Sequence, residues 1–248
     1  MTARLGLMLG VAAVVAAALI GGWYFFIRGD EPPPVSLAGA VASVSDAAAT
    51  STSAATATAE GATTATAEGS ADGSLEGTWT LVAADSFVGY RVKEELVSVG
   101  ATEAVGRTSA VTGSLEFDGS AITAVEVFAD LTQLKSDDDR RDGRLRSQGI
   151  EWGTFPKASF VLAEPIALDG VPAEGETISA TAVGDLTLHG VTNRVEFPLE
   201  GTLSNGLVVV VGSLLIQFAD YDMEAPSAMS VVSVEEQGMI ELQMVFGR

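Results

Sequence analysis

The sequence has no cysteine and one histidine, His189, among its 248 residues. The lack of cysteine excludes disulfide bonds, thiolate zinc sites, iron–sulfur clusters, a thiol nucleophile and a thioether lipid anchor. A lone histidine cannot share a metal ion with a second imidazole, and no G-x-S-x-G or Walker A motif is present to give it a catalytic partner. We therefore expect no metal, no cofactor and no enzymatic activity.

Basic residues are also scarce. The chain has 13 Lys and Arg against 33 Asp and Glu, which gives a formal net charge of -20. Such a surface repels the phosphates of nucleic acids and anionic lipid headgroups. Because 47% of the residues are hydrophobic and only 19% are charged, the composition favours a globular protein with a membrane segment. Nucleic acid is excluded as an expected partner.

Charged residues are absent from residues 5–27, "LGLMLGVAAVVAAALIGGWYFFI". As a helix this stretch is about 35 Å long, enough to cross the hydrocarbon core of a bilayer. Trp23 and Tyr24 lie at its end, where aromatic side chains favour the interface. We predict a signal anchor over residues 1–28, in a single-pass cell-membrane protein whose remaining chain is extracytoplasmic. A cleaved signal peptide, with "LAGA" at 37–40 as its site, is the alternative and predicts a secreted protein.

Large side chains are scarce in the Ala-, Thr- and Ser-rich tract of residues 29–74, which also has no Lys or Arg. The hexapeptide "TATAEG" occurs in it twice, at 56–61 and 64–69. A tract without large apolar residues gains too little burial to offset its conformational entropy. We predict a disordered linker over residues 29–74.

The remaining residues, 75–248, have the length of one domain. Apolar and polar residues alternate in several short runs, as in Val195, Phe197 and Leu199 against Arg194 and Glu196. This period of two is typical of half-buried strands. Turn sequences such as "FDGS" and "LSNG" separate the runs at hairpin-like intervals. The pattern predicts an all-β antiparallel sandwich or barrel.

One segment, "SDDDRRDGRLRSQG" at 136–149, departs from this alternation and predicts a short helix. Ser136 is the expected N-cap, and acidic residues fill the first turn, where the helix dipole favours them. The spacing predicts i,i+4 ion pairs of Asp137 with Arg141 and of Asp142 with Arg146. The segment matches part of a calcium-binding loop but has no glutamate at position 12, so we expect no metal there.

Four arginines fall within seven residues of this helix. They have two interpretations: pairing with the neighbouring aspartates, or a pocket mouth that receives an anionic headgroup, for which the bidentate guanidinium is suited. For the second interpretation, the mouth residues are Arg141, Arg144 and Arg146.

Four stretches occur in order along residues 75–248: "GTWTLVAADSFVGYRV", "RRDGRLRSQGIEWGTFPKASF", "GDLTLHGVTNRVEFPL" and "QFADYDMEAPS". Together they resemble the YceI-like family of exported lipid-binding proteins. The resemblance implies a lipocalin-like antiparallel β-barrel of about eight strands with one short helix, whose apolar interior holds a polyisoprenoid or similar lipid. The chain departs from the family where it has "GIEW", in place of an acidic and aromatic patch, and Arg144, in place of a frequent histidine. These departures predict a mouth that differs in its ligand.

An eight-stranded barrel is wide enough for one slender ligand. Burying CH₂ groups at about 0.8 kcal/mol each makes an isoprene unit worth about 3 kcal/mol, against an association cost of roughly 4 to 15 kcal/mol. About two to five buried units therefore suffice for binding, and the mouth sets any specificity. The residues predicted to line the bore are Val88, Tyr90, Val92, Leu115, Phe117, Phe160, Leu162, Leu186, Leu188, Val195, Phe197, Ile216, Phe218, Ile240, Leu242 and Met244.

The function expected from the resemblance is binding or carrying an isoprenoid or other long-chain lipid without transforming it. Two alternatives stay open: a surface interaction or stress-response module whose barrel is filled by its own side chains, and an enzyme that uses the Arg and Asp groups of residues 136–149. A homodimer is also left open. His189 is predicted to be a turn between strands at 183–188 and 192–199, because Gly190 beside it is free to adopt positive φ.

Overall fold

The structure is a computed structural model that describes residues 32–55, 75–98, 100–168, 170–229 and 231–248. The anchor predicted over residues 1–28 and the two "TATAEG" repeats lie outside these residues. None of the helices in the described ranges is both long enough and apolar enough to cross a membrane.

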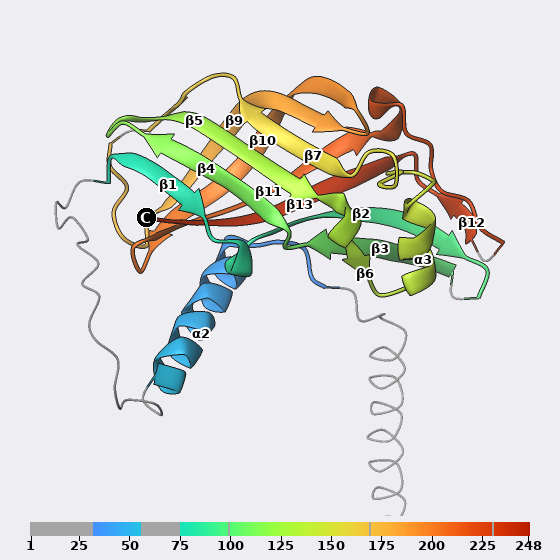
Figure 1. Ribbon diagram of the computed structural model, residues 1–248, viewed down its shortest axis with the longest axis horizontal. Helices are drawn as coiled ribbons and strands as arrows, with labels where there is room; N and C mark the ends of the chain where they lie inside the picture. Colours follow the sequence, from blue (N-terminus) through green and yellow to red (C-terminus); the bar gives the residue numbers. More distant parts are fainter. Residues whose placement is uncertain (1–31, 56–74, 99, 169, 230) are drawn as a thin grey trace, which may run out of the picture.

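The described chain forms one sheet of thirteen strands, in which every strand pairing is antiparallel. Eight of the strands close on themselves as a barrel, because β1 pairs with both β4 and β13 (Figure 1). This architecture confirms the predicted antiparallel barrel. In order around the barrel the strands are β1 (Gly77–Leu81), β4 (Val111–Phe117), β5 (Ala121–Asp130), β7 (Lys157–Leu162), β9 (Thr177–Leu188), β10 (Val191–Ser204), β11 (Leu207–Gln217) and β13 (Gln237–Gly247).

At one end the barrel is extended by further strands. The last residues of β13 pair with β1, whereas Met239 to Gln243 pair with β2 (Phe87–Leu96). On one side of β2 lies β3 (Gly100–Thr108), which pairs in turn with β6 (Lys135–Ser136), and on the other side lies β12 (Val231–Val234). This end also carries the short helix α3 (Asp139–Leu145), and we call it the α3 end (Figure 1). The remaining short elements are β8 (Ile166–Ala167), η1 (Ala83–Asp85), η2 (Leu131–Gln133) and η3 (Phe218–Tyr221).

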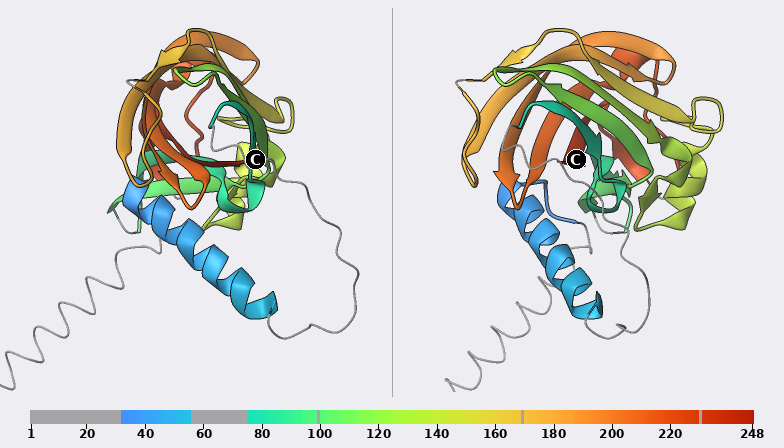
Figure 2. Two further views of the ribbon diagram at one scale, coloured as in Figure 1. Left: turned by 90° about the vertical axis from the view of Figure 1, so that its left-hand side faces the viewer. Right: turned by 60° about the vertical axis from the view of Figure 1, so that its left-hand side comes forward.

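Tight hairpins connect the long strands, as the turn sequences predict. Leu188 pairs with Val191, which leaves His189 and Gly190 as a two-residue turn with φ of 53° and 77°. Positive φ at both central residues is the type I′ geometry that matches the strand twist. The prediction that His189 is a turn residue is therefore confirmed. Figure 2 shows the strands connected in this way curving around the barrel.

A second helix, α2 (Leu37–Ala55), precedes residues 75–248 and corrects one prediction. Part of the tract predicted to be a disordered linker is a helix, whereas the described part of 75–248 has one short α-helix, α3, as predicted. The prediction failed because the tract does contain apolar residues at helical spacing. Leu37, Ala40 and Val44 form one buried face, and burial against a partner surface is what stabilises most helices in proteins.

The partner surface of α2 is the outer face of the barrel. Three valines that point away from the interior meet the helix there: Val209 and Val211 of β11 and Val245 of β13. Val209 and Val245 have no exposed surface at all. Because these strands are covered on both faces, α2 is a structural part of the barrel domain (Figure 1).

Candidate functional site: an apolar cavity with a polar mouth

The barrel encloses a cavity of about 420 Å³. Several inward-facing side chains around it, such as Ile240 and Leu242, are only partly buried although they belong to the hydrophobic core. All but three of the residues predicted to line the bore do line this cavity: Val88, Tyr90, Val92, Leu115, Phe160, Leu186, Leu188, Phe197, Ile216, Phe218, Ile240, Leu242 and Met244.

The three exceptions lie at its margins. Phe117 lines a second, smaller cavity of about 110 Å³. Leu162 packs against the cluster around Phe197, and Val195 packs against the main core, but neither lines a cavity among the described residues. Alternation identifies the face of a strand correctly, but not how far along the strand the cavity extends.

Strand β5 supplies lining residues that the sequence prediction omitted. Val125, Val127 and Ala129 face the cavity and alternate with Glu126 and Phe128. The same period of two that identified the other strands is present in this one, so the signal was available. Leu145 of α3 also reaches the cavity, and only the packing of that helix against the barrel end reveals its contribution.

The two cavities share part of their walls. Leu115, Ile122, Ile166, Leu199 and Val210 line both of them. The smaller cavity lies toward the end of the barrel opposite α3, where Trp79 of β1 is 2% exposed. The bore of the barrel is therefore interrupted by these shared side chains.

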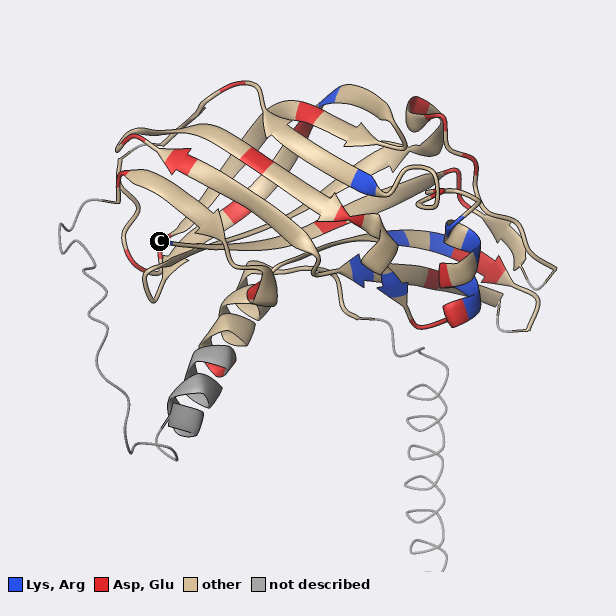
Figure 3. Cartoon of the chain, in the orientation of Figure 1, with Lys and Arg blue, Asp and Glu red and all other residues tan. Residues whose placement is uncertain are grey.

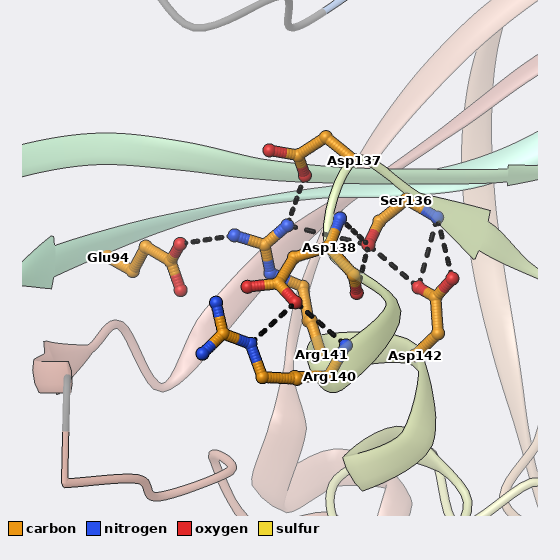
Figure 4. Close-up of polar contacts among 7 residues, drawn as sticks. All are labelled: Glu94, Ser136, Asp137, Asp138, Arg140, Arg141 and Asp142. Atoms are coloured by element: carbon orange, nitrogen blue, oxygen red, sulfur yellow. Dashed lines mark hydrogen bonds and ion pairs between the residues drawn. The ribbon is translucent and has the colours of Figure 1, made fainter.

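Charged residues gather at the α3 end of the barrel (Figure 3). The guanidinium group of Arg141 donates to the carboxylate of Glu94 on β2 at 2.6 Å and also pairs with Asp137 (Figure 4). Both side chains of the first pair are largely buried. Although burial alone would lower the pKa of Arg141, the facing carboxylate of Glu94 raises it. The pairing of Asp137 with Arg141 is as predicted, and Glu94 is a mouth residue that the sequence prediction missed.

The caps and pairs of α3 differ in part from the prediction. The N-cap is Asp138 instead of Ser136, and its carboxylate accepts from the backbone N–H of Arg140 at 2.7 Å. Asp142 does not pair with Arg146. Its carboxylate is buried and accepts from the backbone N–H and the hydroxyl of Ser136 instead (Figure 4).

The three arginines predicted at the mouth therefore have different roles. Arg141 lines the cavity and is held by carboxylates. Arg144 also lines the cavity, and in the described part of the chain it has no ion-pair partner. Arg146 does not line the cavity, and its guanidinium lies over the ring of Trp152 at 5.5 Å from the centroid. Arg140 also lines the cavity and pairs with Asp138 at 3.5 Å, so among the arginines that line the described cavity Arg144 is the one without an ion-pair partner.

Tyr90 lines the cavity near this mouth. Its hydroxyl is buried close to Ser136 but forms no hydrogen bond of good geometry within the described ranges. Burial raises the pKa of the Tyr90 phenol strongly, while the nearby Arg141 acts in the opposite direction. The group is therefore a neutral donor, and a buried donor without a partner is unfavourable unless a ligand or water accepts from it.

Residues 79–246 match the YceI-like domain. The chain belongs to the YceI-like family. It is 30% identical to a UPF0312 protein of Vibrio parahaemolyticus over 139 residues, which cover 52% of this chain and 70% of that relative.

Two solved structures have the same fold as this YceI-like domain. A polyisoprenoid binding domain from Saccharophagus degradans, implicated in plant cell wall breakdown, aligns with a TM-score of 0.56 and 22% identity, over 68% of this chain and 97% of that one. BcnA of Burkholderia cenocepacia aligns with a TM-score of 0.51 and 20% identity, over 66% of this chain and 98% of that one.

His189 does not line either cavity of the YceI-like barrel. Its ring is buried, lies 4.2 Å from the ring of Phe155, and donates from Nδ1 to the backbone carbonyl of Tyr221 at 3.0 Å. The histidine thus connects the β9–β10 turn to η3. The described ranges contain no group of His, Asp and Glu side chains arranged to hold a metal ion.

Proposed function

We propose that this protein binds a long-chain isoprenoid lipid in its barrel and carries it without chemical change, on the extracytoplasmic side of a membrane. The observation that carries the proposal is the cavity of about 420 Å³, whose lining is mostly apolar away from the mouth. This volume falls in the range of about 300 to 1,000 Å³ found for small-molecule sites. The Saccharophagus degradans domain of the same fold is described as polyisoprenoid binding.

The mouth supports an amphiphilic ligand instead of a pure hydrocarbon. The Arg144 guanidinium lines the cavity at the α3 end, and the Tyr90 hydroxyl is buried next to Ser136. A hydroxyl or phosphate headgroup placed there would pair with Arg144 and would replace Ser136 beside the Tyr90 hydroxyl, while the tail lies among Leu186, Phe197 and Leu242. In the alternative function, an interaction module whose barrel is filled by its own side chains, this cavity has no role.

The proposed location rests on the charge-free stretch at 5–27, which we expect to anchor the chain in the membrane. Labelling of the full chain in intact cells with a membrane-impermeant reagent tests this location. Lysines of the barrel, such as Lys157, are expected to react from outside the cytoplasm.

Binding is tested on the full chain reconstituted in lipid nanodiscs. Native mass spectrometry is expected to detect one prenol per chain, and added prenol is expected to raise the unfolding temperature. Val88→Trp fills the cavity and is expected to abolish both effects. Val161→Trp, on the exposed outer face of β7, is the control and should bind as the unmodified chain does. If neither effect is seen with the unmodified chain, the proposed function is wrong.

A further inference from the structure

Seven large hydrophobic side chains are exposed in the described part of the chain, and the three most exposed lie at the α3 end of the cavity. They are Met229, Val97 and Val232, with exposed fractions of 99%, 69% and 60%. Each is a direct neighbour in sequence of a residue that lines the cavity: Ala228, Leu96 and Val231. Because Val231 of β12 pairs with Leu96 of β2, these side chains share one rim. We call Val97, Met229 and Val232 the apolar rim.

Exposed apolar side chains next to a cavity opening mark a contact surface, since soluble surfaces rarely concentrate them without a function. The charged residues around the rim have both signs: Lys93, Glu95, Arg140, Glu224 and Glu235 are all exposed. This mixture gives the rim no preference for an anionic partner, and the net charge of -20 opposes one. The partner that fits is an apolar and electrically neutral surface.

The route of the chain into the barrel places this rim near the predicted anchor. Arg91 of β2 donates to the carbonyl of Pro32 at 2.7 Å, and Arg107 of β3 donates to the carbonyl of Pro33 at 2.9 Å. The segment that these contacts begin, residues 32–44, continues as the buried face of α2, and we call it the strap. The strap is thus fastened to the same β2–β3 hairpin that carries Val97 at its tip.

The strap shortens the connection between barrel and anchor. Only four residues, 28–31, lie between Ile27, the end of the charge-free stretch, and Pro32. The two residues are therefore at most about 18 Å apart. Without the strap, the tract up to residue 75 could extend to roughly 160 Å. The stretch from Arg91, which holds Pro32, to Val97 at the tip of the hairpin is about 20 Å long. This length is similar to the distance allowed between Pro32 and the anchor, so Val97 can reach the surface of the bilayer that the anchor crosses.

From these observations we propose that the apolar rim rests on the surface of a neutral bilayer, held there by the strap, so that the cavity opens directly onto the lipid. This inference rests on the proposed function, because a bilayer is where a long-chain lipid is taken up and released. Insertion of a few apolar side chains into the interface supplies burial without requiring anionic lipid.

The absence of cysteine makes the contact measurable at single positions. Val97→Cys, Met229→Cys and Val232→Cys variants of the full chain, each labelled with an environment-sensitive fluorophore, are reconstituted in phosphatidylcholine vesicles with nitroxide-labelled lipids. All three labels are expected to be blue-shifted and quenched. The matched control is Val171→Cys, which is 57% exposed but lies in the loop between β8 and β9, at the opposite end of the barrel. If the rim labels are quenched no more than the Val171 label, the inference is wrong.

A strap variant tests the short connection. Ala40→Glu places a charge in the buried face of α2, where Ala40 is 1% exposed, and is expected to release the strap and abolish quenching at the rim. Ala42→Glu makes the same change on the exposed face of the helix and should leave the quenching unchanged. Quenching that persists in Ala40→Glu, with protease sensitivity showing the strap released, would contradict the role of the strap.

Two further outcomes separate the inference from its rivals. Quenching that appears only with anionic lipids would overturn the neutral-bilayer contact. A blue shift that occurs equally in detergent without lipid would indicate association between copies of the chain and would also overturn it. Because label quenching does not require a bound prenol, failure of the proposed function and failure of the rim contact are distinguishable.

Discussion

The guanidinium group of Arg91 and the carboxylate of Glu241 lie 2.8 Å apart, although 150 residues separate them in the sequence. Glu241 is almost completely buried and also pairs with Arg107 at 3.3 Å. Its burial is unusual for an outward-facing side chain of a barrel, and the strap explains it, because the carbonyls of Pro32 and Pro33 accept from the same arginines. The ion pair is where the strap meets the barrel.

Glu241→Gln should therefore destabilise the domain. Removing the charge of Glu241 takes the carboxylate partner from Arg107 and leaves Arg91 paired with Glu103 alone. Because Glu241 is buried, we expect a loss of about 3 kcal/mol in the free energy of unfolding. Urea denaturation of the full chain measures it. Glu103→Gln removes the more exposed partner of Arg91 and should lose about 1 kcal/mol or less. Equal losses in the two variants would contradict the role assigned to burial.

Tyr90→Phe tests the headgroup site. If the buried hydroxyl turns from Ser136 to donate to the ligand, its removal should weaken the binding of a prenol by about 1 kcal/mol, roughly fivefold. Binding of a hydrocarbon of the same length should be unchanged, since it offers no acceptor. Competition measured by native mass spectrometry gives both ratios, and an equal effect on both ligands would argue against a hydrogen bond.

The raised pKa of Tyr90 predicts that prenol binding is insensitive to pH over the neutral range. A phenol ordinarily ionises near pH 10, and burial shifts its ionisation in the folded protein to higher pH. The neutral donor is therefore retained as the pH rises toward 10, and prenol affinity should stay constant between about pH 6 and 9. A decline in affinity within this range that is absent in Tyr90→Phe would show that the phenol ionises at lower pH.

Local features of the chain were predictable because their causes are local. The Asn205–Gly206 and His189–Gly190 turns require positive φ and occupy it, and the alternation of β13 assigns Ile240, Leu242 and Met244 to one face. A contact such as Arg91 with Glu241 was not predictable, since either charge could equally have faced solvent. Only the closed barrel brings them together.

The sequence does contain an indication that the outer face of β11 is covered, but it is not found by looking for alternating apolar and polar residues. Residues 207–211, "LVVVV", are continuously apolar, which is typical of a strand covered on both faces. One face lines the interior through Val210, and the other meets α2 through Val209 and Val211. Such a run indicates that a covering element exists, but it does not identify which segment of the chain supplies it.

The wall between the two cavities should limit the length of the ligand. Leu115 is 5% exposed and lines both cavities, so Leu115→Ala is expected to join them and to increase the retention of prenols with about six or more isoprene units. Leu131→Ala removes the same volume from the main cavity alone and serves as the control. Native mass spectrometry with a mixture of prenols measures the preference, and an equal shift in both variants would contradict the assignment.

His189→Gln tests whether the only histidine of the chain contributes to stability, to prenol binding, or to both. The variant loses the contact with Phe155 and the donor to the Tyr221 carbonyl, which leaves a buried acceptor unpaired, and we expect about 1 to 2 kcal/mol less stability. Prenol affinity should be unchanged, because the ring lies outside the cavity. Denaturation and native mass spectrometry on the same sample measure both. A loss of affinity larger than the unfolded fraction explains would place His189 in the binding site and overturn its assignment as a turn residue.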